Sequence, residues 1–263
     1  MTTDSDRTTA SIVEPGRSWG VPEAAVGWFT AQFVGFAAFG VVASLGFDLI
    51  RPQRPGGFLG RAVGQSRTGE FTDDTLPLFL QMLLQVPGWI VMLGLAWVLA
   101  GLAGKARPGW SLKGEIGDVG KGVVVGFLLQ IPIVIIVVNL IILVFGEITP
   151  TGRPLSLVDS IEGPLDVIAL FAVVTIGAPV VEELFYRGII QRSLVERFGP
   201  WIGIGITSFL FGAVHFAWVD LLPLTVVGAG FGILAHRAGR LMPAIIAHIT
   251  FNTVALGGLL LAS

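Results

Sequence analysis

The sequence predicts an all-α protein, a polytopic bundle of about seven and at most eight transmembrane helices. Of its 263 residues, 53% are hydrophobic and only 13% are charged, whereas soluble domains average roughly 25% charged residues. Apolar runs long enough to cross about 30 Å of hydrocarbon, at about 1.5 Å per residue, recur along the chain with short connectors between them. We therefore expect residues 1–22 to form a polar tail and residues 23–263 to form one membrane domain.

The predicted spans follow one another without a large soluble insertion. The first run covers residues 24–47, and the second, 76–103, contains Pro87 and Gly88, which predict a kink. The third run, 122–145, is so rich in Val and Ile that only a membrane helix explains its length. Very short connections between the later runs indicate antiparallel neighbouring helices. These later runs are 165–198, 200–218, 221–238 and 241–262, and the segment 165–263 forms the motif-bearing core.

The distribution of positive charge predicts the orientation of the bundle. The N-terminal tail and every second connector after it hold 11 of the 16 Lys and Arg residues, so the positive-inside rule places the N-terminus in the cytoplasm. This count treats 165–198 as one helix, and a break at Pro179 would add a span and reverse the orientation. Helices rich in Gly and Ala are typical of a bacterial protein, so we expect the cell (inner) membrane as its location.

Charge and cysteine content narrow the partners and the chemistry. A net charge of −2 without a basic tract predicts lipid and a membrane protein or peptide as partners, and no nucleic acid. The chain has no Cys, which excludes thiol nucleophiles, disulfides and cysteine-based zinc sites. The polar N-terminus lacks the apolar stretch of a signal peptide, so we expect the first span itself to direct insertion.

Other protease chemistries are excluded by the motifs they require. No His is followed directly by Glu, so the His-Glu-x-x-His zinc motif is absent. Gly117 and Asp118 lack the earlier glycine of a Gly-x-Gly-Asp aspartyl site. Ser208 lacks the flanking glycines of a serine nucleophile elbow.

Two adjacent carboxylates and a guanidinium stand inside the run 165–198. A charged side chain at the bilayer centre costs about 2.5–3.5 kcal/mol on insertion scales, so such residues mostly face a cavity and serve a function. Glu183 and Arg187 are four residues apart and share a helix face, where they can pair. Glu182, about 100° further round the helix, is then free to point elsewhere. The alternative is a solvated amphipathic extension, which we expect only for the later charges of this run. Those charges are Arg192, Glu196 and Arg197.

Two further polar positions are histidines in apolar surroundings. His215 lies four residues after Phe211 in an otherwise apolar helix, and a lone histidine of this kind is usually structural. His248 and Asn252 repeat the pattern, and their spacing of four predicts that both project from one side of the last helix into the bundle. The remaining histidine, His236, lies at a predicted helix end, where a solvated or capping role explains it.

A carboxylate, two imidazoles and an amide held together in a membrane-embedded cavity suit peptide hydrolysis. Glu182, removed from bulk water, could take a proton from a water molecule that His215 orients. His248 and Asn252 could donate hydrogen bonds to the oxyanion of a tetrahedral intermediate. Alternatively, Glu182, His215 and His248 could bind zinc or another divalent metal that activates the water. The residues thus predict a glutamate-dependent or a metal-dependent endopeptidase.

Three ordered motifs stand out in the last part of the chain. They are Glu182-Glu183-x-x-x-Arg187, Phe211-x-x-x-His215 and His248-x-x-x-Asn252. Together they resemble the CPBP family of membrane proteins, which comprises CAAX-prenyl-endopeptidase-like (type II) and bacteriocin-processing proteins and is also called the abortive-infection family. The resemblance covers about residues 179–253 and implies an intramembrane endopeptidase that hydrolyses a peptide bond in a membrane-associated protein or peptide.

The same resemblance implies roles for the motif residues. Glu182 would be the catalytic carboxylate, and His215 would be its partner in activating water. His248 and Asn252 would bind the oxyanion or, in the metalloprotease interpretation, the metal. To Glu183 and Arg187, which complete the first motif, we assign structural support.

Two other classes of protein remain as alternatives. A non-catalytic membrane scaffold or a bacteriocin-immunity protein could use the same fold for binding while retaining the polar residues. A transporter or proton channel would also place Glu and His inside helices. The chain shows no repeat between its halves, however, and its motif residues are confined to the last part, unlike those of a symmetric transporter.

Overall fold

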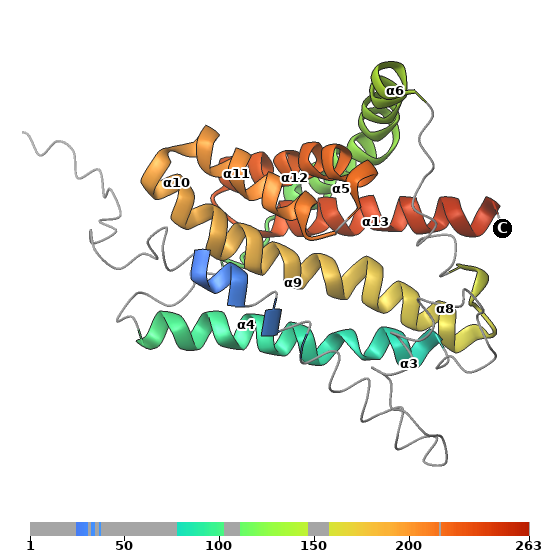
Figure 1. The fold of residues 1–263 in the computed structure, drawn as a ribbon, viewed down its shortest axis with the longest axis horizontal. Helices are drawn as coiled ribbons and strands as arrows, with labels where there is room; N and C mark the ends of the chain where they lie inside the picture. The colour runs from blue at the N-terminus through green and yellow to red at the C-terminus, as the bar shows by residue number, and fades with distance from the viewer. Residues whose placement is uncertain are drawn as a thin grey trace, which may run out of the picture.

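The protein is all-helical wherever its structure is described. A computed structural model describes residues 25–30, 33–34, 37, 78–102, 111–146, 158–215 and 217–262 (Figure 1). Within these residues every regular element is a helix and none is a strand, which confirms the predicted all-α class. The predicted first span, 24–47, lies largely outside the described residues.

Among the described residues, four helices are long and apolar enough to cross a membrane, and two shorter helices are also apolar. The long ones are Ile116–Phe145, Pro164–Phe198, Trp218–Ala238 and Met242–Ala262, and the shorter ones are Leu78–Gly94 and Pro200–Ala213. In chain order the elements, with η for π-helical segments, are α3 (Leu78–Leu83), α4 (Gln85–Leu102), α5 (Ile116–Leu128), η1 (Leu129–Ile133), α6 (Val134–Phe145), α8 (Pro164–Leu170), η2 (Phe171–Gly177), α9 (Ala178–Phe185), η3 (Tyr186–Gln191), α10 (Arg192–Phe198), α11 (Pro200–Ala213), α12 (Trp218–Ala238) and α13 (Met242–Ala262).

Prolines interrupt one helix but not another. Near Pro87 the helix is interrupted at one residue, Leu84, between α3 and α4, and the N–H of Leu84 still bonds the Leu80 carbonyl at 3.1 Å. The cause is local, because a proline lacks an N–H and its ring clashes with the carbonyl four residues earlier, here that of Leu83. At Pro179, by contrast, the helix continues, and Pro164–Phe198 is one 35-residue helix. The break at Pro179 that would have added a span is therefore absent.

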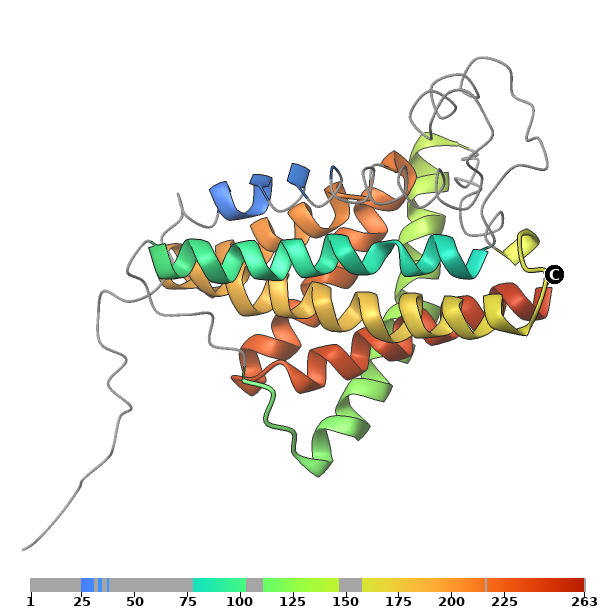
Figure 2. The same ribbon diagram turned by 90° about the horizontal axis from the view of Figure 1, so that it is seen from below.

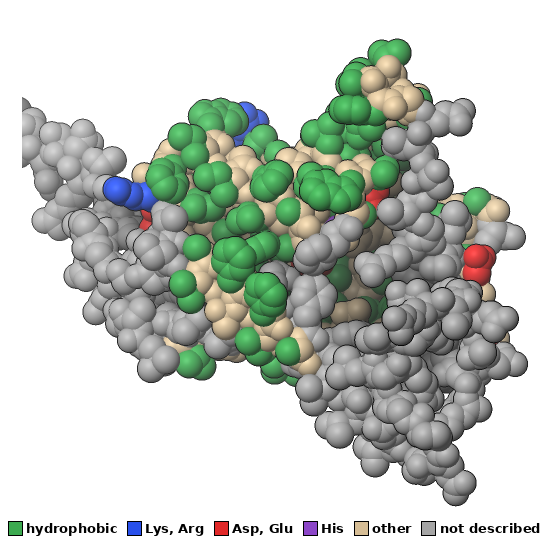
Figure 3. All heavy atoms as spheres, in the orientation of Figure 1, with side chains coloured by type: hydrophobic (Ala, Val, Ile, Leu, Met, Phe, Trp, Pro, Cys, Tyr) green, Lys and Arg blue, Asp and Glu red, His purple; other side chains and the backbone are tan. Residues whose placement is uncertain are grey.

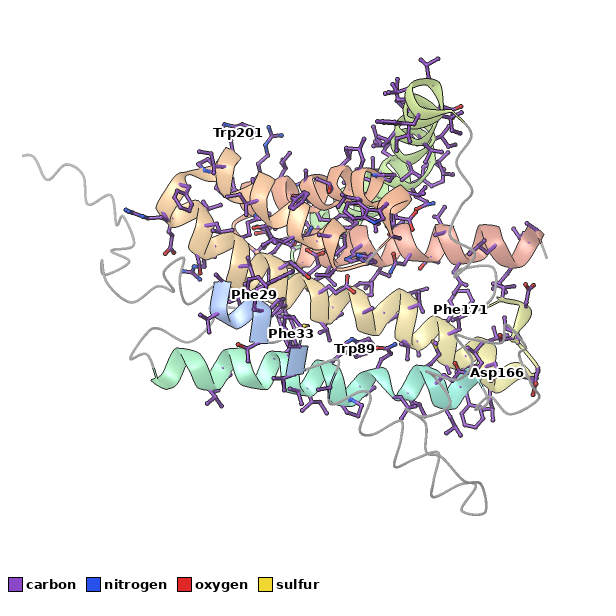
Figure 4. All side chains as sticks on the ribbon, viewed as in Figure 1. Phe29, Phe33, Trp89, Asp166, Phe171 and Trp201 are labelled. Atoms are coloured by element: carbon purple, nitrogen blue, oxygen red, sulfur yellow. The ribbon has the colours of Figure 1, made fainter. Side chains whose placement is uncertain are left out.

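One carboxylate joins the beginnings of two helices that run side by side. Asp166 lies between the first turns of α3 and α8 (Figure 4). It accepts backbone N–H groups from Phe79 of α3 at 2.8 Å and from Glu162 and Gly163 before α8 at 3.0 and 3.1 Å. Both helices thus begin at the same end of the bundle. They continue alongside each other in both ribbon views (Figures 1 and 2), and Trp89 of α4 packs against the longer helix (Figure 4).

The last helix, α13, rests directly on the backbone of α5. Gly122 and Gly126 of α5 form this seat, since a Cβ on Gly122 would come within 2.6 Å of the Ile246 side chain. A Cβ on Gly126 would collide with the backbone carbonyl of Ala247. The α5–η1–α6 helix crosses the other helices at a steep angle (Figure 2). The close contact at the two glycines fixes how near α13 lies to α5.

An ion pair ties the beginning of α5 to the turn before α13. Gly239 takes a left-handed conformation (φ 65°) and ends α12. Arg240 then donates to both carboxylate oxygens of Asp118, at 2.9 Å and 2.6 Å, and contacts Glu115 at 2.8 Å. The bond to Asp118 raises the pKa of Arg240 above its ordinary value.

The outer surface is mostly apolar, as a membrane-embedded bundle requires. Apolar side chains cover most of the described part of the face in Figure 3, which shows few charged side chains. Helix α6 has no buried residue, and Leu143 and Phe145 are among its most exposed side chains. One buried cluster lies where η1, α9, α12 and α13 meet, at residues such as Phe231, Ala244 and Ala247.

Candidate active site

Glu182 and Glu183 sit side by side on α9 but face different surroundings. Successive helical residues point about 100° apart, so one turns into the core while the other does not. Glu183 is completely buried, whereas the side chain of Glu182 is 26% exposed to solvent. Oε1 of Glu183 accepts a hydrogen bond from Nη1 of Arg187 at 2.9 Å. The ion pair predicted from the spacing of four therefore forms, and it leaves Glu182 outside it.

The buried guanidinium of Arg187 is held from several sides. Its Nη2 donates to the Gly228 carbonyl of α12 at 2.8 Å, and its carbon lies 4.8 Å and 5.6 Å from the ring centroids of Phe211 and Phe231. Removing a charge from water costs free energy, and these contacts offset that cost only while the partner groups stay in place. The absence of a side chain on Gly228 matters here, since a Cβ would lie 3.4 Å from Nη2.

His248 of α13 is fixed by the same carboxylate that pairs with Arg187. Its Nδ1 lies 2.9 Å from Oε1 of Glu183, and its ring stacks on Phe231 with centroids 4.6 Å apart at an angle of 23°. Because the carboxylate accepts, Nδ1 carries the hydrogen and Nε2 is turned to the other side. Nε2 lies 3.8 Å from Oε2 of Glu182. This geometry links the two adjacent glutamates through one imidazole, a contact that the sequence analysis did not predict.

The sequence predicted that His215 lies within a helix. The structure places it just beyond the end of α11 instead. Helix α11 ends at Ala213, and the chain turns there towards α12. Helix α12 packs closely against α11, since a Cβ on Gly212 would lie 2.7 Å from the Leu221 carbonyl. Nδ1 of His215 lies 2.9 Å from the Phe211 carbonyl, which leaves Nε2 as its free ring nitrogen. The ring of Phe211 contacts both His215 and His248, with centroids 5.3 and 5.7 Å apart.

Asn252, one turn after His248 on α13, reaches a different helix. Its Nδ2 donates to the carbonyl of Val174 in η2 at 2.8 Å, so one amide N–H is engaged and the other is left for the site. His236, for which only a solvated or capping role was expected, is exposed in the last turn of α12.

The donor atoms do not fit a metal site in this arrangement. Glu182 and His248 approach each other. In both histidines Nδ1 makes a protein contact, so Nε2 is the ring nitrogen that could bind an ion. Among the described residues, no three His, Asp or Glu side chains converge on a point where they could hold an ion. A catalytic zinc normally has three protein ligands, so this set falls short.

An all-helical membrane bundle that holds a paired glutamate, a second glutamate outside the pair and an imidazole between them has the features of a membrane-embedded peptidase. The comparison with known families agrees. Residues 164–254 match the family described as "Type II CAAX prenyl endopeptidase Rce1-like". That segment contains all the motif residues from Glu182 to Asn252, and the predicted family resemblance is confirmed for it.

Two curated proteins are similar to this chain over about 100 residues each. One is "Putative membrane peptidase YdiL" of Bacillus subtilis (strain 168), 33% identical over 111 residues, which are 42% of this chain and 44% of the relative. The other is an "Uncharacterized 24.3 kDa protein" of Escherichia coli, 33% identical over 96 residues, which are 35% and 44%. The chain thus spans less than half the length of each relative it matches. No solved structure matches it significantly.

Proposed function

We propose that the protein is an intramembrane endopeptidase that hydrolyses a peptide bond in a membrane-associated protein or peptide, with Glu182 as its general base. The observation that supports this is the gap of 3.8 Å between Oε2 of Glu182 and Nε2 of His248. It is too long for a direct hydrogen bond, yet one water molecule can bind to both atoms. Among the described residues, no Lys or Arg neutralises Glu182, so its carboxylate is available to accept a proton.

The remaining groups have complementary roles in this proposal. Glu182 takes a proton from the water, the water oxygen attacks the scissile carbonyl carbon, and the proton then passes to the leaving amine as the C–N bond breaks. His215 orients the water through Nε2. The free N–H of Asn252 donates to the oxyanion, and His248 donates from Nε2 when its ring carries both hydrogens. Glu183, which already pairs with Arg187, keeps the imidazole in place through Nδ1. Glu183 and Arg187 hold His248 and do not react.

The experiment is a peptide-cleavage assay with purified protein in liposomes. The probes are apolar peptides with and without a C-terminal prenylated cysteine, because the family description names prenyl endopeptidases. Glu182→Ala and Glu182→Gln should abolish cleavage. The control is Glu196→Gln, which removes an exposed carboxylate from the same long helix and should leave kcat unchanged.

Two results would contradict the proposal. Cleavage by Glu182→Ala at the parental rate would remove Glu182 from catalysis. A parent protein that binds the peptides but cleaves none of them would favour the membrane scaffold or immunity protein instead.

The metal-dependent alternative has a separate readout. If a divalent ion took part, Glu182, His215 and His248 would be its ligands, but their present arrangement does not bring three donors together. We expect cleavage to persist in the presence of a chelator. Stoichiometric zinc in active protein, lost together with activity on His248→Ala, would establish metal chemistry in place of the glutamate mechanism.

A further inference from the structure

Pro179 lies three residues before Glu182, in the first turn of α9, and it is buried in a helix that continues through it. Inside a helix a proline removes one backbone N–H, so a carbonyl of the preceding turn loses its partner. In a membrane that carbonyl cannot turn to water and needs a donor from a neighbouring helix.

The hydrogen bonds of η2 leave the carbonyl of Val174 without a backbone donor. Along the helix, only the N–H of residue 178 in α geometry or of residue 179 in π geometry could reach it. The N–H of Ala178 is bonded to the carbonyl of Val173, and residue 179 is a proline. The donor comes instead from α13, where Nδ2 of Asn252 lies 2.8 Å from the Val174 oxygen.

This bond fixes the orientation of the Asn252 amide. A carbonyl only accepts, so the NH2 group and not Oδ1 must face Val174. One N–H is then bound, and the direction of the second follows from the planarity of the amide. A backbone N–H at position 179 reaches this carbonyl if the π-helical spacing of η2, in which Ala178 bonds Val173, continues by one residue. It would then compete with the side chain for Val174, whereas with α-helical spacing it would bond the carbonyl of Thr175.

We propose that Pro179 is a positioning residue for Asn252. By withholding a backbone N–H, it keeps the Val174 carbonyl open to the Asn252 amide and holds the second amide N–H for the reaction. The link between the two residues stands on the geometry alone, and only its effect on catalysis rests on the proposed function.

The first test restores the N–H with Pro179→Ala and with Pro179→Val, which is closer to proline in size. The melting temperature should stay at or above the parental value, because a helix hydrogen bond is regained. The kcat should fall at least about tenfold, towards the 10²–10³-fold typical of one lost oxyanion donor, with KM within about twofold. The control is Pro132→Ala, a proline in the π-helical segment η1, which should leave kcat unchanged.

A double-mutant cycle separates Asn252 from Glu182 as the target of Pro179. If Pro179 acts through Asn252, then Pro179→Ala should change kcat little in an Asn252→Ala background. Effects that multiply would show that the proline acts on Glu182 instead, and an unchanged kcat in Pro179→Ala would show that it positions nothing. Either result overturns the proposal.

A second set of measurements needs no proteolysis. The chain contains only two asparagines, Asn139 and Asn252, so selective labelling of asparagine side chains with ¹⁵N gives two pairs of amide signals. The Asn252 signals should move in Pro179→Ala and Pro179→Val, while those of Asn139, which bonds within its own helix, should not. Asn252→Ala should also lower the melting temperature of the parent, because it leaves the Val174 carbonyl unpaired, but not that of Pro179→Ala.

These measurements also keep the two proposals apart. If the parent protein cleaves no peptide, the proposed function fails, while the amide signals and melting temperatures still decide whether Pro179 and Asn252 are coupled. Unmoved Asn252 signals overturn the inference. Failure of both proline variants to fold would do so too, since regaining a helix hydrogen bond should not prevent folding.

Discussion

Arg187 carries a buried positive charge that Glu183 balances, so its removal should affect stability before chemistry. Arg187→Ala leaves the carboxylate of Glu183 buried without its cation, and breaking a buried pair in this way costs about 3–5 kcal/mol. We expect a large fall in folded yield and in the melting temperature measured in detergent.

The same helix supplies the control for this prediction. Arg192 and Glu196 also form an i,i+4 pair, at 3.4 Å, but their side chains are 47% and 36% exposed. Exposed pairs contribute about 0.2–1 kcal/mol, so Arg192→Ala should change the melting temperature little. Equal melting temperatures for Arg187→Ala and Arg192→Ala would mean that the buried pair does not stabilise the fold.

His248 and Asn252 should act as one unit in catalysis. If both donate to the oxyanion, each alanine substitution should lower kcat by roughly 10²–10³, with little change in KM. Because the two donors serve one charge, the double variant should lose less than the product of the single losses. Full multiplication of the two effects would indicate that the residues act in separate steps.

For single residues, side-chain contacts within one helix could be predicted from the sequence, whereas contacts between helices could not. The pairing of Glu183 with Arg187 follows from a helical spacing of four and is confirmed. The bond between Glu183 and His248 joins residues 65 positions apart, and no spacing rule reaches across helices. Pro179 was considered only as a possible break, because the carbonyl it frees and the amide that replaces its N–H lie on different helices.

Among the elements, Asp166 stands out because one carboxylate serves the ends of two helices. Its oxygens accept three backbone N–H groups at the beginnings of α3 and α8, where the helix dipoles also favour a negative charge. Asp166→Ala should therefore cost about 1–2 kcal/mol for each helix end, seen as a lower melting temperature. Asp166→Asn, which keeps an acceptor oxygen, should recover part of the loss. The control is Asp159→Ala, at an exposed helical residue shortly before α8, and an effect equal to that of Asp166→Ala would contradict the prediction.

The element boundaries were predictable where apolar runs are long. The runs expected at 165–198 and 241–262 are the helices Pro164–Phe198 and Met242–Ala262, almost to the residue. The run 200–218 was predicted as one span, but α11 ends at Ala213. Composition could not show this, because apart from His215 the residues around the turn before α12 are as apolar as the helix that it ends. The π-helical segments were also not predicted, since they follow from hydrogen bonds and not from composition.

For the molecule as a whole, the arrangement of charge predicts an orientation that can be tested directly. We propose that the end of α10 is cytoplasmic and the connector before α8 is on the opposite side, as the positive-inside rule indicates. The chain has no cysteine of its own, so single cysteines can be labelled without background. In intact cells, a membrane-impermeant thiol reagent should label Asp159→Cys and should label Arg197→Cys only after the membrane is opened. The reverse pattern would invert the orientation.

The glycine seat between α5 and α13 has a consequence for how the sequence can vary. Gly126 lies against the Ala247 backbone, next to the residue that bonds Glu183, while Gly120, six positions earlier on the same helix, has nothing within 4 Å of its Cβ position. In a saturation survey of α5, position 120 should accept nearly any apolar side chain and position 126 none. Even alanine at position 126 would push α13, and His248 with it, away from α5. The two glycines look alike in the sequence, but only one of them would appear as an invariant column among functional variants.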